Sequence, residues 1–174
     1  WEAFLLEPVP DPAAAPNAAL PIDELARRRI AKQYRRVIKD GKKILHSDED
    51  ELVHQLRIDC KKLRYLMEFF AGLFPKKKIG KLIRQLKILQ DELGVFNDLS
   101  VQQVYLLQMA EVLPADDAQA RLGLVAVGSL VERLASEQQA MKPGLADAFS
   151  DFAAASKRAL FRRLLGGKEK ATCL

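Results

Sequence analysis

The chain has 174 residues, of which 49% are hydrophobic, and it carries a formal net charge of +5. This length and composition predict one domain, or two small halves, with a buried core. Two cysteines far apart in a chain of this length exclude a disulfide framework and favour a reducing compartment, so we expect a cytoplasmic protein. No apolar run reaches the ~18 residues of a membrane span, so no membrane partner is predicted.

The net charge hides a strong asymmetry along the sequence. Residues 27–87 hold 19 Lys+Arg and 7 Asp+Glu, which gives +12 for this third of the chain. The remaining residues hold 9 basic and 16 acidic side chains, which gives −7. Such a division predicts an anionic partner for one surface of the protein rather than a generally basic character.

Three segments are predicted in chain order. Residues 1–21 begin with what reads as the last turn of an upstream helix and continue as a Pro/Ala-rich linker, with five prolines between Pro8 and Pro21. Residues 22–165 show helical periodicity and are predicted to form a helical bundle. Residues 166–174 are predicted to be a flexible tail.

The helical segment divides into about six helices. Helix-breaking and capping residues place their boundaries: Pro75, Gly94 as a C-terminal residue, Asn97 as an N-cap, Pro114, and Pro143 at the start of the last helix. The expected helices span residues 22–46, 47–74, 76–93, 97–113, 116–141 and 143–165. No segment alternates with period two, and the connections are short, so the predicted fold is an all-α antiparallel bundle.

The second helix carries the most informative pattern. At about 100° per residue, four side chains fall within roughly 80° of one another and form a basic stripe about 15 Å long. These are His54, Arg57, Lys61 and Arg64. The neighbouring face is apolar and must be buried, so the stripe runs beside the core, where it could hold a polyanion against the protein.

Two further helices carry cations at helical spacing. In the first helix, Arg28, Lys32, Arg35 and Lys39 follow one arc with no acidic residue on it, and Arg29, Arg36 and Lys43 widen that arc. In the third helix, Lys81 and Arg84 belong to a similar arc. A single row of this kind is usually a solvated face. Three successive rows favour polyanion binding, because adjacent like charges repel unless an anion neutralises them.

Metal binding, catalysis and nucleic-acid binding have less support in the sequence than polyanion binding. His54 either forms a hydrogen bond near the helix start or donates to a phosphate, more strongly when protonated. No Cys/His/Asp cluster has metal-ligand spacing, so no metal and no cofactor is predicted. No set of nucleophile, base and metal can be assembled, so we expect no catalytic residue and no enzyme. A nucleic-acid-binding protein shares the same electrostatic basis but lacks interleaved aromatic residues.

A longer pattern surrounds the basic stripe of the second helix. It combines His54, Arg57 and Lys61 with Leu63-Arg64-Tyr65, Glu68-Phe69-Phe70, Leu89-Gln90, Leu93-Gly94 and Asn97-Asp98-Leu99. This combination resembles the CHAD domain, a family of histidine-containing α-helical domains, over most of residues 22–165. The basic helix alone would be far less specific.

The resemblance implies a fold and a ligand. CHAD domains are two four-helix bundles related by a pseudo-twofold axis, and this chain resembles the second repeat, so the upstream repeat is expected to be missing from it. Family members bind inorganic polyphosphate along a basic surface and some associate with polyphosphate granules. The resemblance thus implies binding of polyphosphate, or of phosphate- and sulfate-like anions, without catalysis. An accessory domain of a phosphate-metabolising enzyme and a nucleic-acid-binding protein remain as alternatives.

Overall fold

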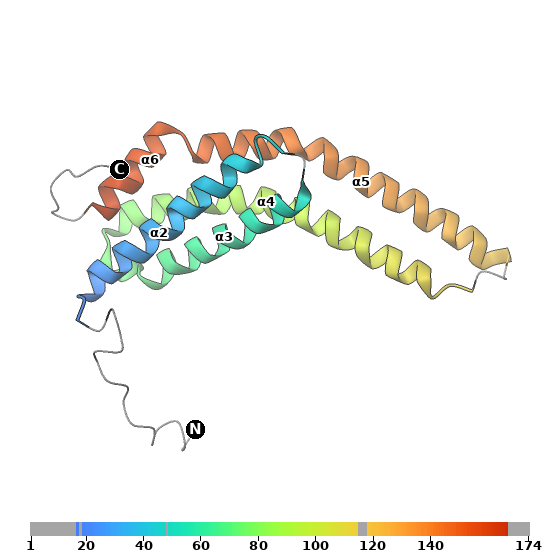
Figure 1. Cartoon of the computed structure of the whole chain (residues 1–174), viewed down its shortest axis with the longest axis horizontal. Coiled ribbons are helices and arrows are strands. Elements are labelled where there is room, and N and C mark those ends of the chain that lie inside the picture. Colours follow the sequence, from blue (N-terminus) through green and yellow to red (C-terminus); the bar gives the residue numbers. More distant parts are fainter. Residues whose placement is uncertain (1–16, 18, 48, 115–117, 167–174) are drawn as a thin grey trace, which may run out of the picture.

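The computed structural model describes residues 17, 19–47, 49–114 and 118–166, and this part of the chain contains helices and no strand (Figure 1). It therefore confirms the all-α fold class. The expected upstream helix end, most of the linker and the C-terminal tail lie outside the described residues. The elements, in order, are α2 (Ile22–Lys43), α3 (Asp50–Phe69), the short 3-10 helix η2 (Ala71–Leu73), α4 (Lys76–Glu111), α5 (Ala118–Phe152) and α6 (Ala155–Leu165).

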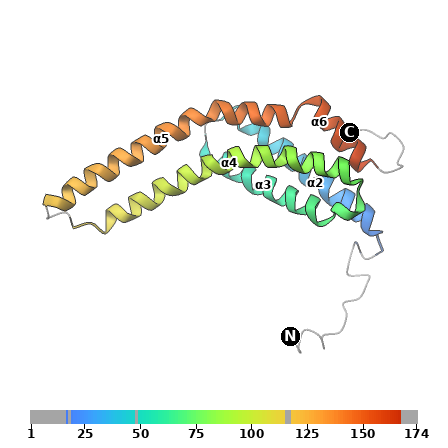
Figure 2. The same ribbon diagram turned by 180° about the vertical axis from the view of Figure 1, so that it is seen from behind.

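Helices α2 and α3, the first half of α4, and the end of α5 with α6 form a bundle (Figures 1 and 2). Each helix turns one apolar stripe inward, as its periodicity predicts. Helix α6 crosses back onto α2, where Tyr34 stacks on Phe161 with ring centroids 3.9 Å apart and Arg27 donates a 2.7 Å hydrogen bond to the carbonyl of Leu164. The centre of the core is formed by Ile30, Leu56, Leu63, Met67, Leu82, Leu86, Leu93, Phe96, Phe149, Phe152 and Phe161.

Helix α4 is one continuous helix of 36 residues, so the predicted break between the third and fourth helices was wrong. Gly94 does not end a helix and Asn97 does not cap one. The apolar face continues through Leu93, Phe96 and Leu99, which are all buried. A glycine inside a helix costs only about 1 kcal/mol, and this continuous packing exceeds that cost.

Helix α5 likewise continues through Pro143, which was expected to begin the sixth helix. The predicted start at Asp116 lies outside the described residues. A proline removes one backbone hydrogen bond, but Met141, Leu145 and Phe149 on either side of it pack against the core and hold the helix together. The helix ends only after Phe152, and α6 follows at Ala155.

The second half of α4 and the first half of α5 project beyond the bundle as a two-helix arm (Figures 1 and 2). At its base, Gln103 Nε2 donates a 2.8 Å hydrogen bond to Oε1 of the buried Gln138, which joins the two helices. No helix in the described part of the chain is both long enough and apolar enough to cross a membrane.

Candidate anion-binding surface

Helix α3 holds the basic stripe beside the core. Its buried residues include Leu56, Cys60 and Leu63, and this packing fixes the rotation of the helix about its axis. His54 is exposed, whereas Arg57, Lys61 and Arg64 are half-buried. Burial raises the pKa of the Cys60 thiol, so this cysteine is an inert core residue.

The stripe lies on the side of α3 that faces α4. Nδ1 of His54 is 2.8 Å from Oδ1 of Asn97 on α4. Because Asn97 lies inside a continuous helix, its amide is available for this contact instead of a cap. An amide oxygen can only accept, so Nδ1 is the donor in this contact, and Nε2 lies on the other side of the ring.

A shallow cavity of about 160 Å³ adjoins His54 and Asn97. Its wall also includes the carboxylates of Asp50 and Glu51 in the first turn of α3. Negative charge is favourable at a helix N-terminus, but it repels phosphate. The surface therefore changes sign at His54, and the basic stretch of α3 begins with Arg57.

Arg64 keeps donors that no described residue uses. Its side chain is 26% exposed, and its guanidinium lies 5.3 Å from the centroid of the exposed Tyr65 ring. Nε is buried without a hydrogen bond, and it lies 3.8 Å from Oε1 of Glu68, which is beyond hydrogen-bond distance. The cation–π contact orients the guanidinium while its terminal amines remain available.

Helix α2 carries the second row of cations on the side away from its buried residues Ile30 and Val37. Lys32, Arg35 and Lys39 are exposed and form no ion pair with any described residue. Arg28 is different, because it pairs with Glu24 one turn earlier. The expectation that this arc carries no acidic partner was therefore wrong at Arg28.

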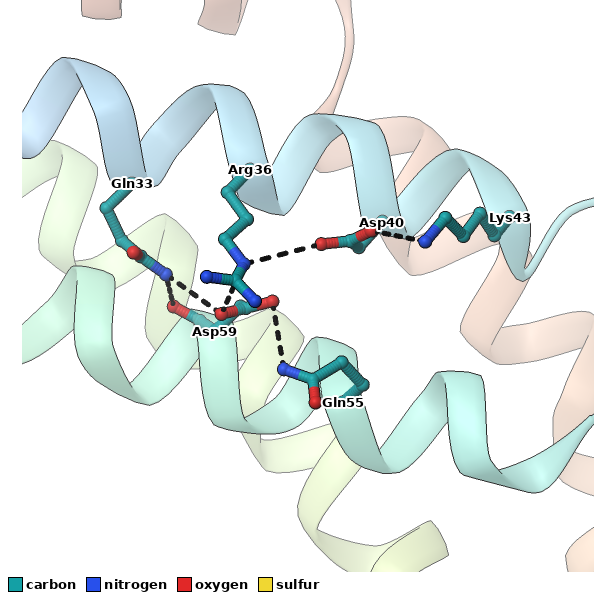
Figure 3. A network of polar contacts seen from close by, with 6 residues as sticks. All are labelled: Gln33, Arg36, Asp40, Lys43, Gln55 and Asp59. Carbon is teal, nitrogen blue, oxygen red and sulfur yellow. Dashed lines mark hydrogen bonds and ion pairs between the residues drawn. The ribbon is translucent and has the colours of Figure 1, made fainter.

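Arg36 and Lys43 do not widen that row, because both belong to a polar network between α2 and α3 (Figure 3). Its centre is Asp59, which is 0% exposed. Arg36 Nε lies 3.3 Å from Asp59 Oδ1 and 3.7 Å from Asp40 Oδ2, and Lys43 Nζ lies 2.7 Å from Asp40 Oδ1. The hydrogen bond and charge of Lys43 lower the pKa of Asp40. Two cations thus meet two carboxylates, and this network has no net charge.

Two glutamines complete the network around Asp59. Gln33 Nε2 donates to the backbone carbonyl of Asp59 at 3.0 Å and to Oδ1 at 3.1 Å, and Gln55 Nε2 donates to Oδ2 at 3.3 Å. This role of Asp59 was not predicted from the sequence. The signal was a carboxylate on the apolar face of α3, beside Leu56 and Leu63, where only a paired charge is stable.

Helix α4 carries the third row. Lys81 and Arg84 are exposed, and neither forms an ion pair within the described residues. They lie on the outer side of α4, opposite the buried Leu82 and Leu86. The structure thus places the cations of α3 beside α4. The cations of α2 lie on the outer side of α2, which packs against α3 as well. No described group of three His, Cys, Asp or Glu side chains could hold a metal ion.

Residues 1–107 match the family model of the CHAD domain. The chain belongs to the CHAD domain family. The match contains all of α2 and α3 and most of α4, including all ten candidate binding residues, and it ends before α5. CHAD domains are associated with polyphosphate at the level of the family. No curated protein matches the sequence significantly.

Proposed function

We propose that this CHAD domain is a binding module for inorganic polyphosphate, and that it is not an enzyme. One observation carries the proposal: exposed or half-buried cations on three successive helices have no carboxylate partner among the described residues. They are Lys32, Arg35, Lys39, Arg57, Lys61, Lys81 and Arg84. Rows of uncompensated charge repel one another, and a polyanion removes this repulsion.

The α3 row is the proposed centre of the site. Side chains one turn apart on a helix are about 5–6 Å apart, so Arg57, Lys61 and Arg64 can contact successive parts of one linear polyphosphate. The two arginines offer forked donors that match phosphate oxygens, whereas Lys61 acts as a mobile point charge. His54 would be the last contact of this row, at the end that lies beside Asp50 and Glu51.

The outer rows extend the contact in this proposal. Arg28, Lys32, Arg35 and Lys39 on α2, and Lys81 and Arg84 on α4, lie on the two helices that flank α3. A flexible chain of phosphates can follow such a divided surface, whereas a stiff DNA duplex requires cations that match its fixed groove spacing. We therefore propose polyphosphate as the preferred ligand, and attachment to polyphosphate granules as its consequence.

A charge reversal tests the site. In Arg57→Glu/Lys61→Glu, two charge-assisted contacts worth ~1.5 kcal/mol each are lost, so the affinity for long-chain polyphosphate should fall on the order of 100-fold. The matched control is Arg121→Glu/Arg133→Glu, which changes the net charge equally on exposed residues of α5. Isothermal titration at fixed salt gives the affinities, and circular dichroism confirms that both variants fold.

Two outcomes would contradict the proposal. The first is equal loss of affinity in both double variants, which would indicate a nonspecific effect of net charge. The second is tighter binding of duplex or single-stranded DNA than of polyphosphate at the same salt concentration. Release of orthophosphate from polyphosphate with added Mg²⁺ or Mn²⁺ would show that the protein is an enzyme.

A further inference from the structure

The two-helix arm exposes an unusual amount of apolar surface. On α4 and its C-cap residue Val112, one row follows helical spacing at Val101, Val104, Tyr105 and Val112, with exposed fractions of 58%, 53%, 62% and 80%. We call these four residues, with Gln108 between them, the arm stripe. A helix that presents apolar residues on the side away from its partner is typical of a helix inside a larger bundle.

The opposite side of α4 already has its partner. Leu99 is buried and Gln103 bonds to Gln138 of α5, so the α5-facing side of the arm is occupied. At about 100° per residue, the arm stripe lies roughly opposite Gln103. Within the described part of the chain, nothing covers it (Figures 1 and 2).

The charge distribution indicates what could cover it. No charged residue occurs between Leu99 and Ala110, and Arg121 is the only one between Ala118 and Val131. Residues 27–87, in contrast, carry 19 basic and 7 acidic residues. Two copies of this chain would repel each other through their basic surfaces, but they can approach through their arms without like-charge repulsion. Glu111 at the end of the arm stripe and Arg121 on α5 have opposite charges, so they favour neither an acidic nor a basic partner.

The size of the arm stripe fits a small interface between two copies. The exposed parts of its four apolar side chains amount to on the order of 500 Å² per copy, so a symmetric contact would bury on the order of 1,000 Å², at the lower limit of specific interfaces. When both copies use the same surface, the contact is symmetric and the assembly stops at a twofold dimer. Gln108 lies in the middle of the arm stripe, where a polar side chain can bond to its counterpart and fix the register.

We propose that the arm stripe is a homodimerisation surface, in which α4 of one copy packs antiparallel against α4 of a second copy. The body of each copy then points away from the contact, because the arm projects beyond the bundle (Figure 1). The basic rows on α2 and α3 remain open, and one polyphosphate chain could bridge the two copies. The dimer itself depends only on the arm and not on polyphosphate binding.

Sedimentation velocity of the full chain without polyphosphate tests the proposal. The small interface predicts a monomer–dimer equilibrium with a dissociation constant on the order of 10 μM. Val104→Lys places a charge at the middle of the contact and should weaken the dimer at least ~10-fold. The control, Gln139→Lys, adds the same charge to an exposed position of α5, outside the arm stripe, and should leave the equilibrium unchanged.

Both substitutions are at exposed positions, so neither disturbs the core, and circular dichroism checks that both variants fold. A dimer lost in Val104→Lys and kept in Gln139→Lys supports the proposal. A monomer at concentrations well above ~10 μM, or a dimer that Val104→Lys does not weaken, overturns it and assigns the arm stripe to a different partner.

Discussion

At the scale of single residues, Asp59 is a buried carboxylate that joins α2 to α3. It is fully buried and accepts contacts from Gln33, Arg36 and Gln55, so it fixes the position of α2 on α3. The same contacts hold Arg36 and Lys43 inside a neutral network (Figure 3). Two basic residues that look available in the sequence are thereby removed from the candidate binding surface.

Asp59→Asn should lower the free energy of unfolding by about 2 kcal/mol. The amide cannot accept at both positions, so the part-buried Gln55 loses its acceptor, whereas Gln33 keeps the backbone carbonyl of residue 59, and the ion pair with Arg36 is lost. The cost stays below that of a fully buried ion pair because the Arg36 side chain is 56% exposed. Urea denaturation monitored by circular dichroism measures the change.

The control for this variant is Asp98→Asn, which alters an exposed aspartate without an ion pair in the described part of the chain. Its free energy of unfolding should change by less than ~0.5 kcal/mol. Equal stability of Asp59→Asn and the wild type would contradict the structural role assigned to the network.

At the scale of helices, two glycines have opposite roles. Gly41 lies on α2 where it meets α5, and an added Cβ would lie only 1.9 Å from the ring of Phe149. Gly94 lies inside α4, and an added Cβ would meet no atom within 4 Å. The first glycine allows close helix packing, whereas the second only lowers helix propensity.

The two alanine substitutions should therefore change stability in opposite directions. Gly94→Ala should raise the free energy of unfolding by roughly 0.5–1 kcal/mol, the usual gain in helix propensity. Gly41→Ala should lower it by about 1–3 kcal/mol, because Phe149 must move out of a packed core. Thermal and urea denaturation of both variants give the comparison. Stabilisation by Gly41→Ala would contradict the observed approach of α2 to α5.

The sequence predicted which segments are helical more reliably than where the helices end. The periodicity of α2, α3 and the first half of α4 was sufficient to identify them. Gly94, Asn97 and Pro143 were interpreted as boundaries because local preferences favour ends at such residues. Tertiary packing overrides these preferences, since Leu93, Phe96 and Phe149 bury their side chains across the predicted breaks.

The candidate site shows a similar division. The helical spacing of His54, Arg57, Lys61 and Arg64 could be predicted because it is local to one helix. Which cation meets the buried Asp59 depends on contacts between helices and could not be predicted from spacing. Asp59, on α3, neutralises Arg36, on α2, and these residues are far apart in sequence. Glu24, one turn from Arg28, and Asp40, about one turn from both Arg36 and Lys43, lie at local helical spacing and were accessible to sequence reasoning.

At the scale of the whole molecule, the chain separates two kinds of surface. The bundle carries three rows of cations, and the arm carries an apolar, almost uncharged stripe. The first is proposed to bind polyphosphate and the second to bind another copy of the chain. Because the two surfaces lie on different parts of the molecule (Figure 2), variants on one should leave the other intact.

The salt dependence of polyphosphate binding tests the central claim most directly. If unpaired cations on α3 contact the ligand, binding releases counterions, and the logarithm of the affinity falls linearly with the logarithm of the salt concentration. By analogy with single-stranded nucleic acids, each contacting cation contributes ~0.7 to this slope, so Arg57→Gln/Lys61→Gln should reduce its magnitude by about 1.4. Arg121→Gln/Arg133→Gln should leave it unchanged. Equal slopes for the wild type and Arg57→Gln/Lys61→Gln would contradict the claim that these two cations hold the polyanion.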